Sequence, residues 1–268
     1  MVNRIKSVLK NMKNTTIRPI GEKPPYPVSV QTKVVEHNTP PSPNDVGLFD
    51  EIEANKINQA RLAHLSSLQL SFADKTVLDV GCGVGHLAQF FVRAGSKVVC
   101  VDGREENIVA LQSQYPNLTA HVVNVDTDSL VKFGKFDIVF CYGLLYHLEN
   151  PLRALRNMKA VCGELLLLET LICDHSLPLL QLVDEPLIEN QALGGLGCRP
   201  SPSYVVQALS RVGYLHVYAP KEPPLYRDFQ IKWKNNLEWW RDDHPLRCVF
   251  IASTTKLQNP QLISLLED

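Results

Sequence analysis

The chain has 268 residues, 45% of them hydrophobic, and a formal net charge of −1 with a pI of about 6.7. This length suits one α/β domain with extensions, and the near-neutral charge argues against a polyanion-binding surface over the whole molecule. Seven cysteines without a C-x-x-C pair argue against a zinc site and a disulfide framework. We therefore expect no metal. Because neither an 18-residue apolar run nor a secretion signal is present, we expect a cytoplasmic protein.

The first 47 residues differ in character from the rest of the chain. Residues 1–18 begin "MVNRIKSVLKNMKN", in which apolar side chains share one helical face and basic residues lie among them. Such a basic helix can contact an anionic membrane surface or a partner, although a solvated, frayed terminus is the simpler interpretation. Seven prolines over 19–46 then predict an extended arm. We therefore divide the chain into an arm (1–47), a domain (48–256) and a tail (257–268).

Strand and helix patterns alternate through the first part of the domain. After a helix predicted over 48–70, near-continuous apolar runs predict strands that are covered on both faces by helices. The alternation predicts an α/β fold with a doubly wound, Rossmann-like, mostly parallel sheet. Its predicted strands are 75–80, 97–101, 119–125, 136–143 and 163–172, and its predicted helices are 86–94, 104–115 and 151–161.

The rhythm changes after residue 172. A helix over 201–214 and strands over 215–219 and 247–253 bring the predicted sheet to seven strands, of which the last is antiparallel. Two insertions, 173–202 and 220–246, are predicted to form a lid on the ligand side of the sheet. The first contains Asp184, Glu185 and Glu189, for which a solvated face is favoured over a second acid site. The second contains an aromatic cluster that can stack on a planar or sugar ligand or close a small satellite core: Tyr226, Trp233, Trp239 and Trp240.

The stretch "TVLDVGCGVGH" over 76–86 joins the first predicted strand to a helix through a glycine-rich loop. Glycines let the backbone turn tightly and approach a ligand. A dinucleotide fingerprint needs a third glycine where His86 stands, and the carboxylate of Asp79 would repel a pyrophosphate but attract an amino group. A tight turn with no ligand is the alternative.

This D-x-G-x-G-x-G stretch resembles motif I of the class I S-adenosylmethionine (SAM)-dependent methyltransferases. The resemblance implies SAM as cofactor and S-adenosylhomocysteine as product, with the acid and the loop facing the methionine end. It assigns to the cofactor site Asp79, Gly81, Cys82, Gly83 and Gly85.

The next two strand ends extend the predicted cofactor site. Asp102 follows Asp79 by 23 residues, a spacing at which an acid accepts hydrogen bonds from ribose hydroxyls; helix capping is its alternative role. Gly103 and Arg104 are included beside it, Arg104 either next to the adenine or solvated. In "VVNVDTDSL" the resemblance implies that an acid bonds the adenine amino group. Asp126 is favoured for this role over Asp128, with Val125 or Thr127 supplying backbone contacts.

The stretch "FDIVFCYGLLYHLENP" is a second point of resemblance to the superfamily. Ligands of such sheets bind at the carboxyl ends of the strands, so Cys141 and Tyr142 are expected near the sulfonium. Methyl transfer often requires a base, and His147 is the candidate, with Tyr146 orienting the acceptor. Fixing the turn by a bond to a backbone carbonyl is the alternative role of His147.

The segments "GLLYH", "LETL" and "PSPSYVVQALSRVGY" are also similar to the tRNA wobble-uridine carboxymethyltransferases, over roughly residues 77–215. That resemblance implies carboxy-SAM as donor, for which Arg199 is a candidate cation. The chain lacks their substantial extra domain before the glycine loop, and it has no basic stretch beyond residue 18. We therefore favour methyl transfer to oxygen of a small or medium polar acceptor, such as a sugar, glycan or natural-product hydroxyl, over nucleic acid. The alternatives are tRNA modification and a non-catalytic SAM-binding partner subunit.

Overall fold

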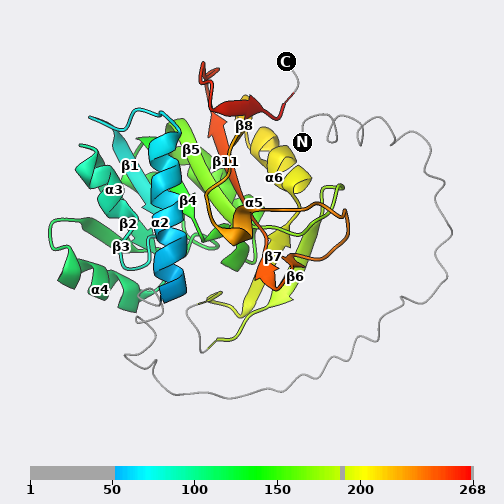
Figure 1. Ribbon diagram of the computed structural model, residues 1–268. Coiled ribbons are helices and arrows are strands. Elements are labelled where there is room, and N and C mark those ends of the chain that lie inside the picture. Colours follow the sequence, from blue (N-terminus) through cyan, green and yellow to red (C-terminus); the bar gives the residue numbers. More distant parts are fainter. Residues whose placement is uncertain (1–51, 188–190, 267–268) are drawn as a thin grey trace. The chain divides into compact units, whose positions relative to one another are not determined.

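The computed structural model describes residues 52–187 and 191–266 (Figure 1). Its centre is an eight-stranded sheet with the strand order β12-β8-β11-β5-β4-β1-β2-β3. The predicted basic helix, the proline-rich arm and the first residues of the predicted 48–70 helix lie outside the described residues.

The first five strands form where apolar runs predicted them and pair in parallel. They are β1 (Thr76–Val80), β2 (Lys97–Asp102), β3 (Thr119–Val122), β4 (Phe136–Tyr142) and β5 (Cys162–Leu171). Beyond β5, the strand β11 (Arg247–Ser253) pairs antiparallel with both β5 and β8 (His216–Pro220). The predicted doubly wound class with an antiparallel late strand is confirmed.

The sheet has one strand more than predicted. The strand β12 (Leu262–Ser264) pairs antiparallel with β8, within the segment that the sequence assigned to a tail. The sequence did not predict β12 because it has only three residues, of which only Leu262 is buried. A pattern of alternating buried and exposed residues cannot be recognised over so short a stretch.

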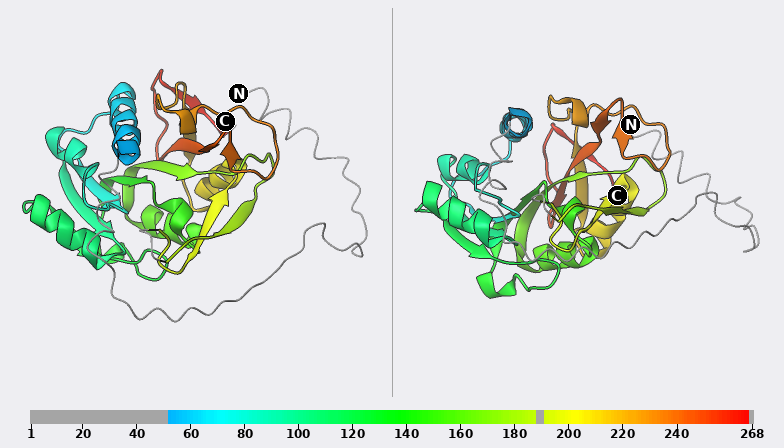
Figure 2. Two further views of the ribbon diagram at one scale, coloured as in Figure 1. Left: turned by 60° about the horizontal axis from the view of Figure 1, so that its bottom comes forward. Right: turned by 90° about the horizontal axis from the view of Figure 1, so that it is seen from below.

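Helices cover both faces of the sheet (Figure 2). Alternate residues of β1 and β4 explain why. Val77 and Ile138 join the cluster that includes Leu65 of α2 (Ile52–Ser67), whereas Leu78 and Val139 join the cluster packed on the opposite face. The helices of that opposite face are α5 (Pro151–Val161) and α6 (Pro202–Arg211), while α3 (Ala88–Arg93) and α4 (Glu105–Gln114) flank β1 to β3. Within the described ranges, no helix is long and apolar enough to cross a bilayer.

Both insertions carry short hairpins that the sequence did not predict. The first contains β6 (Leu180–Asp184) and β7 (Leu196–Pro200), paired antiparallel apart from the main sheet. The second contains the 3₁₀ turn η5 (Arg227–Phe229) and the two-residue strands β9 (Trp240–Arg241) and β10 (His244–Pro245). Asp174 joins the insertions, because its buried carboxylate accepts hydrogen bonds from the backbone of Lys234 and Asn235 and pairs with Arg241.

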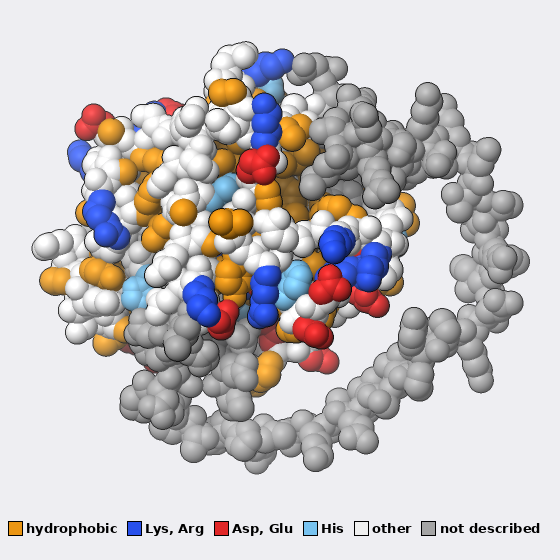
Figure 3. Space-filling view, viewed as in Figure 1, with side chains coloured by type: hydrophobic (Ala, Val, Ile, Leu, Met, Phe, Trp, Pro, Cys, Tyr) orange, Lys and Arg blue, Asp and Glu red, His pale blue; other side chains and the backbone are white. Residues whose placement is uncertain are grey.

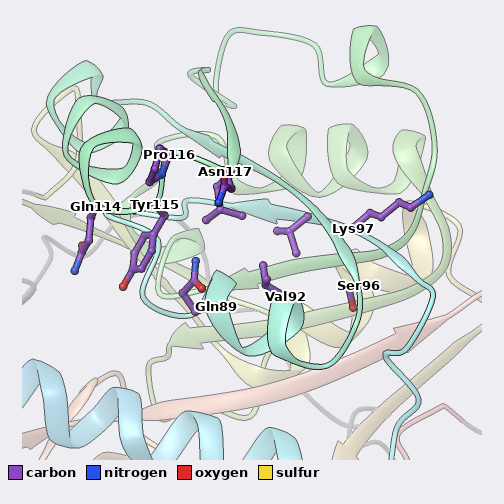
Figure 4. A pocket seen from close by; sticks show the side chains of 10 residues that line it. Gln89, Val92, Ser96, Lys97, Gln114, Tyr115, Pro116 and Asn117 are labelled. Atoms are coloured by element: carbon purple, nitrogen blue, oxygen red, sulfur yellow. The ribbon is translucent and has the colours of Figure 1, made fainter.

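The strand order reverses between β1 and β4, the point at which doubly wound sheets bind ligands at the carboxyl ends of their strands. The glycine loop, the end of β2 and the 3₁₀ turn η4 (Leu145–His147) all lie at this edge. A cavity of about 460 Å³ lies away from this edge. It is lined by residues at the start of β2 and by the residues that immediately precede β3 (Figure 4). Its lining contains none of the predicted site residues and includes Gln89, Lys97 and Tyr115.

Candidate functional site

The glycine loop adopts backbone angles that favour glycine. Gly81, Gly83 and Gly85 have φ values of +78°, +53° and +88°. A side chain at Gly81 would also place its Cβ 2.6 Å from the Cβ of Leu144. The loop therefore lies directly against the turn that follows β4, which joins the two segments that the sequence singled out.

Asp79 is a buried acid at the end of β1. Its side chain belongs to a residue only 1% exposed, and its Oδ2 has no hydrogen-bond partner. Burial, reinforced by the nearby charge of Asp102, raises the pKa of Asp79 to about 8. An unpartnered carboxylate in such a place is costly for the fold, and a bound cationic donor would relieve that cost.

Arg61 brings a positive charge to the same edge from α2. Its Nη2 lies 3.3 Å from where a Cβ of Gly143 would stand, immediately after β4. The guanidinium binds Glu169 through Nη2 at 2.5 Å and Asn58 through Nη1 at 2.9 Å, while its buried Nε has no hydrogen-bond partner. The sequence did not identify Arg61, which precedes the glycine loop by 20 residues in an ordinary helix.

These two unsatisfied atoms test whether the site suits SAM. The methionine end of SAM carries an α-ammonium and an α-carboxylate, which match the free oxygen of Asp79 and the free Nε of Arg61 in charge and hydrogen-bonding type. The residues present therefore fit the cofactor, with Asp79 able to hold its amino group and Arg61 its carboxylate. When bound, SAM supplies a methyl group on a positively charged sulfur.

Asp102 connects the glycine loop to the start of α4. Its Oδ2 accepts a hydrogen bond from the Gly83 backbone, and its Oδ1 accepts from the Arg104 backbone and from Asn107 Nδ2, each at 2.9 Å. The carboxylate thus fixes the loop whether or not a ligand is bound. Its predicted contact with ribose stays a prediction, and Asn107 is a neighbour that the sequence did not reveal.

Asp126 likewise has a structural role. Its two oxygens accept hydrogen bonds from the backbone of Glu149 at 3.1 Å and of Asn150 at 3.0 Å, just before α5 begins. Its predicted contact with adenine stays a prediction. Val125 and Cys141 bury their side chains in the hydrophobic core, so they can meet a ligand only through backbone atoms. Tyr142 and Cys82 are also buried, and their predicted contacts with the cofactor remain predictions.

The first insertion covers the end of β2. A Cβ at Gly103 would lie 2.5 Å from Leu193 Cδ1, and Arg104 Nη2 donates to the Gln191 carbonyl at 3.1 Å. Gln191 and Leu193 of this insertion therefore approach the predicted nucleoside side of the site, and the predicted lid stays a prediction.

His147 pairs with a carboxylate from the same insertion. Its Nδ1 lies 2.6 Å from Glu185 Oε2. Burial lowers the pKa of His147 and outweighs the opposing effect of Glu185, so the imidazole is neutral at neutral pH. The Glu185 residue is 8% exposed, which shows that the favoured sequence interpretation of a solvated acidic face was wrong for this residue.

Two guanidinium groups lie against Tyr146. The Cζ atoms of Arg199 and Arg247 are 5.3 Å and 5.2 Å from the centre of its ring. Arg199 Cζ also lies 4.5 Å from the ring centre of Trp239, whose neighbour Trp240 is 46% exposed. Of the predicted aromatic cluster, Trp239 is thus the member that reaches this side of the site.

Glu169 holds the arginines together at the end of β5. It is fully buried and accepts from Arg61 and, at 2.9 Å, from Arg247 Nη1. Burial acts to raise the pKa of Glu169, but the two arginines lower it by more and keep the carboxylate ionised. Glu169 was not among the predicted site residues, although an acid inside the apolar run "LLLLETLI" is a usable signal of a paired, buried charge.

The doubly wound sheet, the glycine loop and the buried acid that precedes it define the class I SAM-dependent methyltransferases, and the predicted class is confirmed. The chain belongs to the methyltransferase domain family, which it matches over residues 54–258. The cofactor of this class is SAM.

Curated relatives carry two kinds of name. The chain is 31% identical over 163 residues to a tRNA U34 carboxymethyltransferase of Haemophilus influenzae, covering 58% of this chain and 49% of the relative. It is 35% identical over 107 residues to a ubiquinone biosynthesis O-methyltransferase of Albidiferax ferrireducens, covering 38% and 42%. The chain thus spans about half the length of the curated relatives it matches.

Solved structures support the fold. The N-terminal domain of EvdMO1 with S-adenosylhomocysteine bound superposes with a TM-score of 0.56 at 20% identity, covering 73% of this chain and 79% of that one. A SAM-dependent methyltransferase of Mesorhizobium loti gives 0.52 at 18% identity, covering 72% and 97%.

Proposed function

We propose that this chain transfers a methyl group from SAM to a hydroxyl oxygen of a small or medium polar acceptor, such as a sugar, a glycan or a natural product. The observation that carries this proposal is His147, which is neutral, paired with Glu185, and placed on the turn after β4. A hydroxyl must lose its proton as it is methylated, and a neutral imidazole is suited to accept that proton near neutral pH.

The surroundings of His147 support a compact acceptor. Tyr146 and Trp239 offer aromatic surfaces, which stack on sugars and planar rings. On the face shown in Figure 3, the described Lys and Arg side chains are interspersed with Asp and Glu rather than gathered in a stripe. Such a surface suits a small acceptor better than a long phosphate backbone. The ubiquinone biosynthesis relative is also an O-methyltransferase by name.

The proposal is tested with the full chain and radiolabelled SAM. Methyl glycosides, sugar nucleotides, catechols and unmodified tRNA are offered as acceptors, and SAM binding is measured by calorimetry. Replacing His147 with Ala is expected to lower turnover by about 10²- to 10⁴-fold, with little change in SAM affinity, because it removes only the base. The control His121→Ala alters an exposed histidine on β3 and is expected to keep full turnover.

Two results would contradict the proposal. One is that the chain binds no SAM, and the other is that the His147→Ala variant turns over as fast as the native chain. Binding of SAM without transfer to any of the acceptors would instead favour the non-catalytic partner subunit.

A second candidate is carboxymethyl transfer from carboxy-SAM to the wobble uridine of tRNA. Arg199 and Arg247 lie on Tyr146, and the buried Nε of Arg199 has no hydrogen-bond partner, whereas Arg247 Nε lies 3.4 Å from Asp228 Oδ2. Guanidinium N–H groups are strong donors to a carboxylate, which the carboxy-SAM donor carries. Relatives at about 31% identity bear this activity in their name.

Calorimetry separates the two candidates. If the second is right, carboxy-SAM binds at least about tenfold more tightly than SAM, and Arg199→Gln removes that preference because a charge-assisted hydrogen bond is lost. Equal affinity for the two donors would rule it out. Unmodified tRNA and the small acceptors, offered with each donor, then show which transfer takes place.

A further inference from the structure

Two charged residues of the first insertion, Glu185 and Arg199, lie beside the candidate base His147. Glu185 follows the end of β6, and Arg199 lies on β7, opposite Gln181 in the register of the hairpin. Neither strand belongs to the main sheet, so this hairpin is an addition to the doubly wound core. It nevertheless reaches His147, on the turn after the central strand β4.

The Glu185 carboxylate is fixed from three directions. Its Oε2 contacts His147 Nδ1 at 2.6 Å and accepts from the Ala192 backbone at 2.9 Å, while its Oε1 accepts from Arg199 Nη1 at 3.1 Å. Arg199 Nη1 also donates to the Tyr146 carbonyl at 3.2 Å, which ties β7 to the residue next to the base. Such a network leaves the carboxylate little rotational freedom.

An ionised carboxylate only accepts hydrogen bonds, so the nitrogen facing it must carry the hydrogen. Glu185 is ionised: burial acts to raise its pKa, but His147, the Ala192 backbone and Arg199 lower it by more. In the neutral imidazole, Nδ1 is therefore the protonated nitrogen and Nε2 keeps the free electron pair. Arg199 and Arg247 oppose protonation of the ring, and Glu185 favours it.

We infer that Glu185, held by Arg199, is the positioning residue of this methyltransferase: it fixes His147 as the Nδ1–H tautomer and leaves Nε2 to take the proton of the acceptor. The acceptor's O–H bond would break as its oxygen bonds to the methyl carbon, while the methyl carbon–sulfur bond of the donor breaks and leaves S-adenosylhomocysteine with an uncharged sulfur. The proton passes to Nε2, and the imidazolium so formed donates to Glu185. This inference rests on the proposed function, which gives His147 the role of base.

A purely structural role for Glu185 would leave the tautomer of His147 unchanged, so the tautomer is measured directly. The full chain is labelled with ¹⁵N-histidine, and ¹H–¹⁵N correlation spectra are recorded over a pH titration without any acceptor. A His147→Gln variant assigns the signal. The native chain is expected to show His147 as a single Nδ1–H tautomer.

Glu185→Gln keeps the shape of the side chain and removes its charge. It is expected to lower the pKa of His147 by about one unit and to mix the two tautomers, because the amide can donate as well as accept. Glu185→Asp is expected to restore the single tautomer in part. The control Glu149→Gln changes an exposed carboxylate near the same hairpin and is expected to alter neither property. An unchanged tautomer and pKa in a folded Glu185→Gln protein would overturn the inference.

Turnover separates this inference from the proposed function. With the acceptor identified by the radiolabel assay, Glu185→Gln is expected to lower kcat by about 10- to 100-fold with KM nearly unchanged, as for other residues that orient a functional imidazole. If His147→Ala is fully active, the proposed function fails even where the spectra agree. If His147→Ala is inactive but Glu185→Gln keeps the native kcat, only the positioning role is wrong.

Discussion

Asp79 is expected to make the affinity for SAM depend on pH. Its pKa of about 8 means that the carboxyl of the ligand-free protein is protonated at pH 7. Holding the α-ammonium of SAM requires the carboxylate, so binding must remove that proton, at a cost of about 1.4 kcal/mol for each pH unit below 8. Because the apparent Kd scales with 1 + 10^(pKa − pH), it should fall by about 25-fold between pH 6 and about 7.5, a range in which the SAM amine stays largely charged.

Calorimetry in two buffers with different ionisation enthalpies measures both consequences. The native chain is expected to release close to one proton on binding SAM near pH 6.5, and to bind more tightly as the pH rises. Asp79→Asn cannot ionise, so its weaker binding should lose both the pH dependence and the proton release. A native Kd that is flat over this range, or an equal slope in Asp79→Asn, would refute the assignment of Asp79 to the amino group.

The same carboxyl affects the stability of the ligand-free protein in the opposite sense. The folded pKa is raised above the unfolded value of 3.8, so the folded chain holds a proton that the unfolded chain releases. The resulting stabilisation is complete below pH 3.8 and is lost by up to about 1.4 kcal/mol per pH unit as the pH rises to 8. Thermal melts above pH 8 should therefore find ligand-free Asp79→Asn more stable than the native chain. A lower melting temperature for this variant would contradict the burial argument.

Two further substitutions test the architecture around the site. Glu169→Gln leaves the buried guanidinium groups of Arg61 and Arg247 without their shared anion. Denaturant unfolding should show that the free energy of unfolding falls by about 3–5 kcal/mol. A fall of less than about 1 kcal/mol would show that the three charges contribute little to stability as a group. Gly103→Ala places a Cβ 2.5 Å from Leu193 and should weaken SAM binding measured by calorimetry, whereas the double variant with Leu193→Ala should recover. An equal defect in the single and double variants would show that the clash with Leu193 is not the cause.

The cofactor half of the site was predictable because its signals are local in sequence. The strand ends that carry Asp79 and Asp102 are marked by apolar runs buried on both faces, and the glycines follow within a few residues. The positive φ of Gly81 could be expected from the sequence, because glycine is the residue that adopts such angles most readily. A buried strand followed within a few residues by glycines can therefore be recognised in a single sequence.

Around the candidate base, residues such as His147 and Tyr146 were predictable, but their partners were not, because the contacts join distant segments. Arg61 and Glu169 are 108 residues apart, and Glu185 reaches His147 from a hairpin 38 residues further along the chain. The hairpin has no clean two-residue periodicity, since glycines and a proline stand where alternating side chains would show it. An acid such as Glu185 is then read as solvated by default, and only its tertiary neighbours reveal that it is buried.

Arg199 connects the two insertions beside the candidate base. Its guanidinium holds the carboxylate that orients His147, and it also lies 4.5 Å from the ring of Trp239 in the other insertion. Asp174 ties the same insertions together by its bonds to the backbone at 234 and 235. A change that reshapes the aromatic wall for a new acceptor must therefore move the group that anchors Glu185. We therefore expect acceptor choice and proton acceptance to be coupled in this protein.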